Sequence, residues 1–344
     1  MTDAISRAYG CLLGLVCGDA AGAVLEFSNV KITDDIASKA MSMPGGGVWN
    51  VGPGQITDDS ELALSLAFAL CESDQKELPL NEIAANYVDW YNSNPFDCGV
   101  TCSNSFSIER GSNGLASELM IARSACRNGA SESNGALMRV APLAIWCSDK
   151  PRSVIAQFAR KEASLTHPSQ VVQDCSALYC IAIAHLINNP GDSAGAVQAV
   201  EEYTREENVC EKVQGWVFEK YDIESLDCQK NMGHVKWAFL LALHFLRSGQ
   251  KYESAILQTL MKRGDTDTNA AIVGAILGAL HGSENIPEYM SRPVLSFKCD
   301  TEETSIDGEA GSVEKEGHER PAKYNAANVK TLAKSLMSHI SHDS

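Results

Sequence analysis

Two short clusters of threonine and aspartate carry side chains of the kind that can bind divalent metal ions. The first, Thr57-Asp58-Asp59, stands directly before a run of alanine and leucine. Taken alone, threonine and aspartate at these positions are also typical of a helix N-terminus. Its hydroxyl and carboxylate oxygens can accept hydrogen bonds from the free N–H groups of the first turn, and they face the positive end of the helix dipole. The first cluster could therefore be a helix cap or part of a metal site.

The second cluster, at residues 264–269, also stands directly before a predicted helix. Asp265, Asp267 and Thr268 could supply three oxygen ligands from one turn, which is more than a cap requires. Together the two clusters hold four carboxylates, which would repel one another strongly in a dry site without cations. Ligation by oxygen alone favours Mg²⁺ or Mn²⁺ over zinc or copper. We therefore predict a site for divalent cations, provided that the fold brings the clusters together.

The apolar residues around these clusters repeat at helical spacing and predict an all-α protein. Helices are expected over 60–71, 171–187, 234–247 and 269–281. Two segments carry glycine at every fourth position: Gly10, Gly14, Gly18 and Gly22, and later Gly274, Gly278 and Gly282. Each glycine in a helix costs about 1 kcal/mol relative to alanine, so close backbone contact between buried helices would explain the stripes. The alternative is that the glycines break the first segment into loops.

One compact domain is predicted for residues 1–295, because apolar segments run through most of this length. Residues 296–322 are acidic and lack large apolar side chains apart from Ile306 and Val313, so we expect them to be disordered. Residues 323–344 form a possible C-terminal helix with Val329, Leu332 and Leu336 on one face. The pattern leaves open whether that helix packs on the domain.

The net charge of −16 argues against binding to nucleic acid or to an anionic membrane. No uncharged apolar stretch reaches the roughly 18 residues that a membrane span needs. The twelve cysteines are scattered and lack the paired spacings of zinc sites. Near the N-terminus, Asp3 and Asp19 weaken the interpretation of the apolar run between them as a secretory signal. We expect an intracellular, cytoplasmic monomer.

Five segments, in order along the chain, resemble the signature segments of the ADP-ribosylglycohydrolase family, which includes the dinitrogenase reductase-activating glycohydrolases. They are 18–22 with Glu26, 54–59, 134–139 with Ala141 and Pro142, Thr166 with His167, and 264–269. Five segments in this order are far more specific than either acidic cluster. The resemblance, which extends from about residue 6 to about residue 290, implies an all-α domain of the ADP-ribosylglycohydrolase type with a dinuclear metal cleft.

The resemblance also implies how the metal ligands are shared. Two divalent cations, Mg²⁺ or Mn²⁺, would lie in the cleft beneath the substituted ribose of ADP-ribose. The whole first cluster would hold one of them. Asp265 and Thr268 would hold the other, and Asp267 would bridge the two. Glu26 would lie over the cleft and contact metal, water or substrate.

Three further stretches are expected to line the substrate: Ser133, Asn134 and Gly135; Asp97, Gly99 and Thr101; and His167. The first resembles the family's phosphate loop, in which backbone N–H groups meet the pyrophosphate. The second resembles another substrate-lining segment, although a local turn explains it equally well. His167 either faces the ligand or is a packed residue.

The implied reaction is hydrolysis at the anomeric carbon of ribose, with Glu26 or Asp97 assisting proton transfer. The substrate would be an ADP-ribosylated protein, arginine-linked as first choice, or a small ADP-ribose conjugate. One alternative is a non-catalytic or structural relative that at most binds ADP-ribose; the presence of all six expected ligands and Glu26 argues against it. Another is a metal-dependent phosphohydrolase, in which residues 134–139 have no obvious reason to recur.

Overall fold

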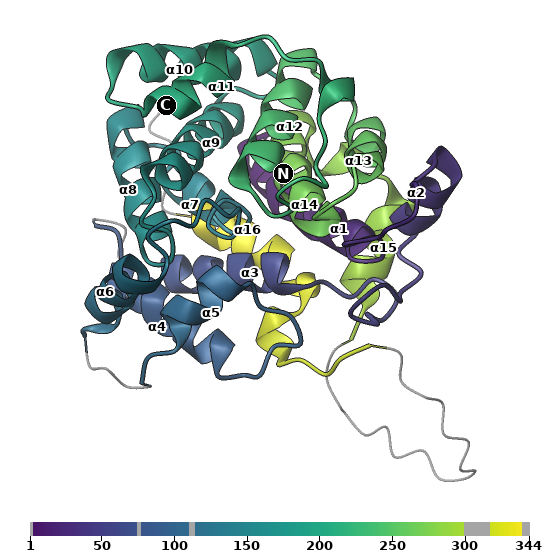
Figure 1. Cartoon of the computed structure of the whole chain (residues 1–344), viewed down its shortest axis with the longest axis horizontal. Coiled ribbons are helices and arrows are strands. Elements are labelled where there is room, and N and C mark those ends of the chain that lie inside the picture. Colours follow the sequence, from purple (N-terminus) through teal and green to yellow (C-terminus); the bar gives the residue numbers. More distant parts are fainter. Residues whose placement is uncertain (1–2, 74–76, 110–113, 299–316, 339–344) are drawn as a thin grey trace.

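The computed structural model describes residues 3–73, 77–109, 114–298 and 317–338, which form helices and loops without a β-sheet (Figure 1). The α-helices are α1 (Asp3–Gly22), α2 (Asp34–Met41), α3 (Asp58–Cys71), α4 (Leu80–Tyr91), α5 (Val100–Phe106), α6 (Ala116–Arg127), α7 (Ala141–Trp146), α8 (Arg152–Ser164), α9 (Gln170–Asn188), α10 (Ser193–Glu206), α11 (Glu211–Phe218), α12 (Val235–Ser248), α13 (Tyr252–Met261), α14 (Thr266–His281), α15 (Glu288–Ser296) and α16 (Val329–Met337). Short 3₁₀ helices are η1 (Ile223–Ser225), η2 (Ser283–Asn285), η3 (Ala322–Tyr324) and η4 (Ala326–Asn328). The all-α prediction and its four helices are confirmed.

Helices α1 and α14 pack against each other through the two glycine stripes. A Cβ added at Gly10, Gly14 or Gly18 would collide with the backbone carbonyl of Gly278, Gly274 or Ala270, respectively. The first stripe lies within one continuous helix, so the alternative in which it breaks into loops is wrong. At the end of this antiparallel pair, a Cβ at Gly22 would meet the backbone of Asp267. The glycine contact thus brings the end of α1 to the second acidic cluster.

Helix α9 lies in the core of the domain. By length and hydropathy it could cross a membrane, but 83% of the apolar window is buried inside the protein. The hydroxyl of Tyr179 in α9 donates to the carbonyl oxygen of Ile272 in α14 at 2.7 Å. This bond ties the core helix to the helix that carries the second cluster.

The C-terminal helix packs on the domain, which the sequence pattern left open. Helix α16 buries Val329, Leu332 and Leu336 and contacts α1, α3 and α7 (Figure 1). Residues 299–316 of the acidic segment, for which we predicted disorder, lie outside the described residues. Its last part, residues 317–322, lies against the domain, with Arg320 only 5% exposed.

Candidate metal centre and substrate cleft

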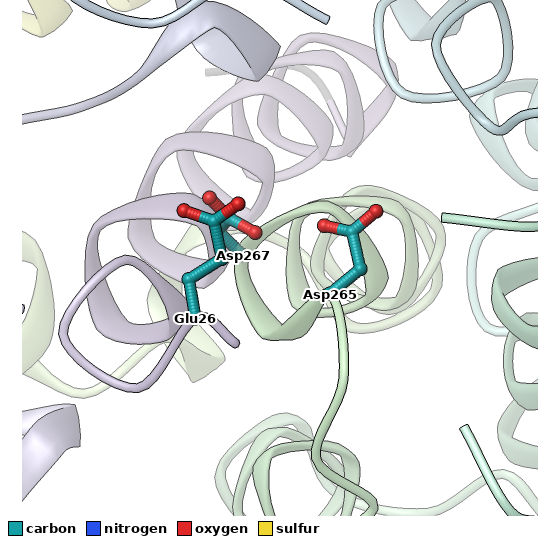
Figure 2. A group of neighbouring side chains, drawn as sticks. All are labelled: Glu26, Asp265 and Asp267. Carbon is teal, nitrogen blue, oxygen red and sulfur yellow. The ribbon is translucent and has the colours of Figure 1, made fainter. Parts of the chain in front are cut away.

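Glu26, Asp265 and Asp267 form a compact group of carboxylates. Each offers one oxygen, and these three atoms lie within 4.8 Å of one another. Figure 2 shows Glu26 just beyond α1 and the two aspartates at the start of α14, with all three carboxylates turned to the same side. The close packing of α1 on α14 therefore builds a group that can share a divalent cation.

The first cluster is held in place by a buried aspartate in α1. The carboxylate of Asp19 accepts hydrogen bonds from the backbone N–H of Thr57 at 3.0 Å and from its hydroxyl at 2.8 Å. It also accepts from the backbone N–H of Ser60 at 3.1 Å and from the hydroxyl of Ser60. Asp19 thus satisfies the first turn of α3, and the side chain of Thr57 makes no cap hydrogen bond. The first turn of α3 therefore does not depend on the side chain of Thr57 as a helix cap.

The two clusters meet where α3 contacts α14, and Asp59 lies close enough to Asp265 for the charge of that residue to affect its pKa. Burial, followed by the charges of Asp58, Asp19 and Asp265, raises the pKa of Asp59 well above its usual range. Two turns separated by about 200 residues in the sequence therefore share one site.

Burial also raises the pKa of the other carboxyl groups in this centre. The pKa of Glu26 rises to about 8, through burial first and then through the charges of Asp265 and Asp97. The pKa of Asp97 rises to about 7, through burial and then Asp265. Among the described residues, none of these carboxylates forms an ion pair with lysine or arginine.

This donor set fits a divalent cation. It consists of oxygen atoms, it carries several negative charges, and Oδ1 of the fully buried Asp59 has no hydrogen-bond partner. Glu26, Asp265 and Asp267 are the residues whose spacing supports ligation directly. The ligand roles of Thr57, Asp58, Asp59 and Thr268, which adjoin them, stay predictions.

The predicted phosphate loop is tied directly to the metal centre. The side-chain amide of Asn134 donates to Oδ2 of Asp265 at 2.8 Å, and its backbone N–H donates to the carbonyl oxygen of Gly233 at 2.8 Å. A Cβ at Gly135 would lie 3.0 Å from the sulfur of Cys102. The loop is therefore fixed on both sides, and a small residue is needed at its turn.

The predicted segment with Asp97, Gly99 and Thr101 lies between the metal centre and this loop. The backbone N–H of Gly99, at the start of α5, donates to Oδ2 of Asp58 at 3.2 Å. The hydroxyl of Ser133 donates to that of Thr101 at 3.2 Å. The segment is thus more than a local turn, since it contacts both parts of the cleft.

A directed chain of hydrogen bonds runs from Arg139 to the loop. Nη2 of Arg139 donates to the hydroxyl of Thr166 at 2.9 Å, and this hydroxyl lies 2.8 Å from Nδ1 of His167. Burial first, and then Arg139, lowers the pKa of His167 to about 3, so the ring is neutral. The hydroxyl of Ser133 donates to Thr101, so it accepts from Nε2–H of His167 at 2.8 Å, and Nδ1 of the neutral ring then accepts from the hydroxyl of Thr166. His167 is fully buried and reaches the cleft through Ser133. Its direct contact with the ligand stays a prediction.

The sequence matches the model of the ADP-ribosylglycohydrolase family over residues 1–317. The chain belongs to this family. It is 30% identical to a protein of Acanthamoeba polyphaga mimivirus that is assigned as ADP-ribosyl glycohydrolase L543. The alignment covers 85% of this chain and 92% of that protein. The chain is 28% identical over 86% of its length to 92% of the ADP-ribosyl-[dinitrogen reductase] glycohydrolase of Rhodospirillum rubrum. It is also 28% identical over 83% of its length to 73% of ADP-ribosylarginine hydrolase Tri1 of Pseudomonas putida.

The fold is similar to that of a solved structure titled ADP-ribosylglycohydrolase-related protein complex. The TM-score is 0.72 at 20% identity, and the similarity covers 98% of this chain and 99% of the other. At this identity the likeness shows the fold alone. The family match and the fold agree that this protein is an ADP-ribosylglycohydrolase, which is a hydrolase.

Two residues that hold the site of this ADP-ribosylglycohydrolase together have no predicted role in it. Asp19 lies in the first signature segment and argues against a secretory signal, but its contact with the first cluster is not predicted. A carboxylate inside an apolar helix needs a buried partner, so its position was a usable signal. Trp49 donates from Nε1 to Oε2 of Glu26 at 2.5 Å. Nothing in the sequence around Trp49 indicated this contact.

Proposed function

We propose that this ADP-ribosylglycohydrolase removes ADP-ribose from modified protein, with an arginine linkage as first choice, and that it requires two divalent cations, Mg²⁺ or Mn²⁺. The observation that carries the proposal is the hydrogen bond between Asn134 and Asp265, which joins the phosphate loop to the acidic centre. The relatives named for dinitrogen reductase and for ADP-ribosylarginine support a modified protein and an arginine linkage.

The described residues divide the work of binding and reaction. The turn at 133–135 is proposed to bind the pyrophosphate, with the backbone N–H of Gly135 as a donor, because the N–H of Asn134 already donates to the carbonyl oxygen of Gly233. The side-chain bond from Asn134 to Asp265 fixes this turn relative to the carboxylates. The cations, when bound, would orient the ribose hydroxyls and activate water. Glu26 and Asp97 are the carboxyl groups proposed to move a proton during cleavage of the glycosidic bond.

The deciding experiment is a panel of arginine-, serine- and O-acetyl-linked ADP-ribose substrates assayed with Mg²⁺, Mn²⁺ and chelator. We expect ADP-ribose to be released fastest from the arginine linkage, and chelator to abolish the release. Calorimetric binding of ADP-ribose without turnover of any substrate would indicate the non-catalytic relative. Phosphate release from simple esters, without release of ADP-ribose, would indicate a phosphohydrolase.

We also propose that the protein acts inside the cell. The described cysteines are all unpaired, including the exposed Cys126, as is usual in reducing compartments. Recovery of the native protein from the culture medium rather than from cells would contradict this proposal.

A further inference from the structure

Residues 317–320, in the last part of the acidic segment, lie directly on the loop that carries Trp49. The side-chain amide of Gln55 pairs with both backbone groups of His318. Oε1 of Gln55 accepts from the His318 N–H at 2.9 Å, and Nε2 donates to the His318 carbonyl oxygen at 2.8 Å. Gly317 has φ +98°, and a Cβ there would collide with Gln55 and Gly52. This close approach therefore requires glycine at position 317.

Arg320 fastens the same residues to helix α3. Its guanidinium binds the carboxylate of Glu61 through Nε at 2.9 Å and Nη2 at 2.7 Å, and the two side chains are 3% and 2% exposed. Nη1 also donates to the carbonyl oxygen of Ser93 at 2.9 Å. A buried bidentate pair with further hydrogen bonds holds its partners in one geometry. His318 therefore stands two residues from an anchor that is fixed on α3.

The ring of His318 connects the segment that carries Asp97 with the loop whose Trp49 binds Glu26. Nε2 lies 2.6 Å from the carbonyl oxygen of Trp49, which can only accept, so Nε2 carries the proton. The ring stacks on Phe96, the residue before Asp97, with centroids 4.2 Å apart and planes 13° from parallel. Since Trp49 donates in turn to Glu26, a continuous path of contacts runs from Phe96 and His318 to Glu26.

The loop on this path needs an external support. Gly45, Gly46 and Gly47 all adopt positive φ, and so does Asn50. Glycine-rich backbone loses much conformational entropy on ordering, so each contact that fixes it matters. Within the loop, Gly46 and Val51 form an antiparallel bridge, and the N–H of Asn50 donates to the carbonyl oxygen of Gly47 at 3.2 Å. The bond from His318 is made inside the turn that this bridge closes, at Trp49, the residue that reaches Glu26.

We propose that His318 is a positioning residue for Glu26. It holds the backbone of Trp49 so that the indole N–H keeps the Glu26 carboxylate turned toward Asp265 and Asp267. The consequence for turnover rests on the proposed role of Glu26, whereas the consequence for Trp49 does not.

The test separates the two contacts of the ring. His318→Phe keeps the stacking on Phe96 and removes the donor, while His318→Gln keeps an N–H donor near the position of Nε2 and removes the ring. We expect His318→Phe to lower kcat about tenfold with KM changed less than about twofold, and His318→Gln to retain most of the activity. Trp49→Phe should lower kcat to a similar extent.

Combining His318→Phe with Trp49→Phe should cause no further loss, because both substitutions break one path. The control is His281→Phe, which removes a comparable bond from Nε2 to the carbonyl oxygen of Gln250 at 2.8 Å and should leave kcat unchanged. Fully additive losses in the double variant would overturn the path through Trp49. So would an equal loss in the His281 variant.

A second readout needs neither metal nor substrate. The fluorescence of Trp49 is obtained by subtracting the signal of the matching Trp49→Phe variant from the signal of each protein. We expect His318→Phe to increase acrylamide quenching of this difference signal, and His318→Gln to leave it near the wild-type value. An unchanged signal together with unchanged kcat in His318→Phe overturns the proposal. If wild type releases no ADP-ribose but the quenching changes as expected, the proposed function fails while the support of Trp49 by His318 stands.

Discussion

Two buried regions of this protein hold carboxylates in opposite ways. Behind the phosphate loop, Glu162 is fully buried, pairs with Nε of Arg139 at 2.8 Å and accepts from the hydroxyl of Tyr87 at 2.7 Å. In the acidic centre, Glu26 and its neighbouring aspartates are buried without an arginine or lysine partner among the described residues. In the first region the chain supplies both partners of the ion pair. In the second region, which we call incomplete, the described residues supply carboxylates without a basic partner. A buried acidic group without a base must take up either protons or positive charge from outside, and this is the physical basis for a cation site.

The largest effect is expected from Asp267→Ala, which removes a carboxylate from the incomplete region. We expect metal uptake and turnover both to be lost, by at least about a hundredfold, because the acidic group loses a central member. Calorimetry with Mn²⁺ and an assay of ADP-ribose release measure the two effects. Asp35→Ala, on the exposed face of α2, is the control. Full activity in the Asp267 variant would refute the site.

Glu162→Gln tests the completed region. Removing the charge leaves Arg139 buried and unpaired, so we expect the free energy of unfolding to fall by about 3–5 kcal/mol in urea denaturation. The control is Glu202→Gln, whose partner Arg152 is 48% exposed. That change should leave the free energy of unfolding nearly unchanged, because an exposed ion pair is screened by solvent. Similar small losses in both variants would show that the Arg139 pair is not a structural centre.

Asp59→Asn makes a comparable chemical change in the incomplete region and should have the opposite sign. Without metal, it removes a charge that burial and neighbouring acids disfavour, so we expect stabilisation by about 1 kcal/mol. The measurement is urea denaturation of protein stripped with chelator. Destabilisation as large as that of Glu162→Gln would remove the contrast between the regions.

The smallest effect is a pH dependence of the metal-free protein. The pKa values of Glu26 and Asp97 are raised to about 8 and about 7. The folded state therefore binds protons more tightly, and the associated stability is lost as pH rises from the ordinary carboxyl range through these values. We expect Tm without metal to fall by a few degrees between pH 5 and pH 8. Added Mn²⁺ should remove the decline, and a flat metal-free profile would contradict the charge argument.

Much of the fold and part of the site could be predicted, because the relevant signals are local. Apolar spacing predicts the faces of α3, α9, α12 and α14, and the four-residue glycine spacing predicts that buried helices touch through their backbones. The residue types at 57–59 and 265–268 indicate cation chemistry on their own. The order of the five signature segments pointed to the family that the comparisons then showed.

The partners of buried polar groups could not be predicted in this way. Asp19 meets Thr57 at a separation of 38 residues, and Arg320 meets Glu61 at 259. Arg320 stood in a segment whose composition predicts disorder, yet it is buried. Composition predicts whether a segment as a whole tends to stay solvated. One buried bidentate ion pair can nevertheless hold a few of its residues in place.

The sequence by itself determined which atoms are available for chemistry and which helix faces are apolar, since both follow from residue type and from the fixed period of a helix. The tertiary structure alone decided which carboxylates receive a base and which remain without one. That choice depends on the packing of helices far apart in the chain. Here the contact of α1 with α14 gathers acids that no lysine or arginine of the described residues reaches.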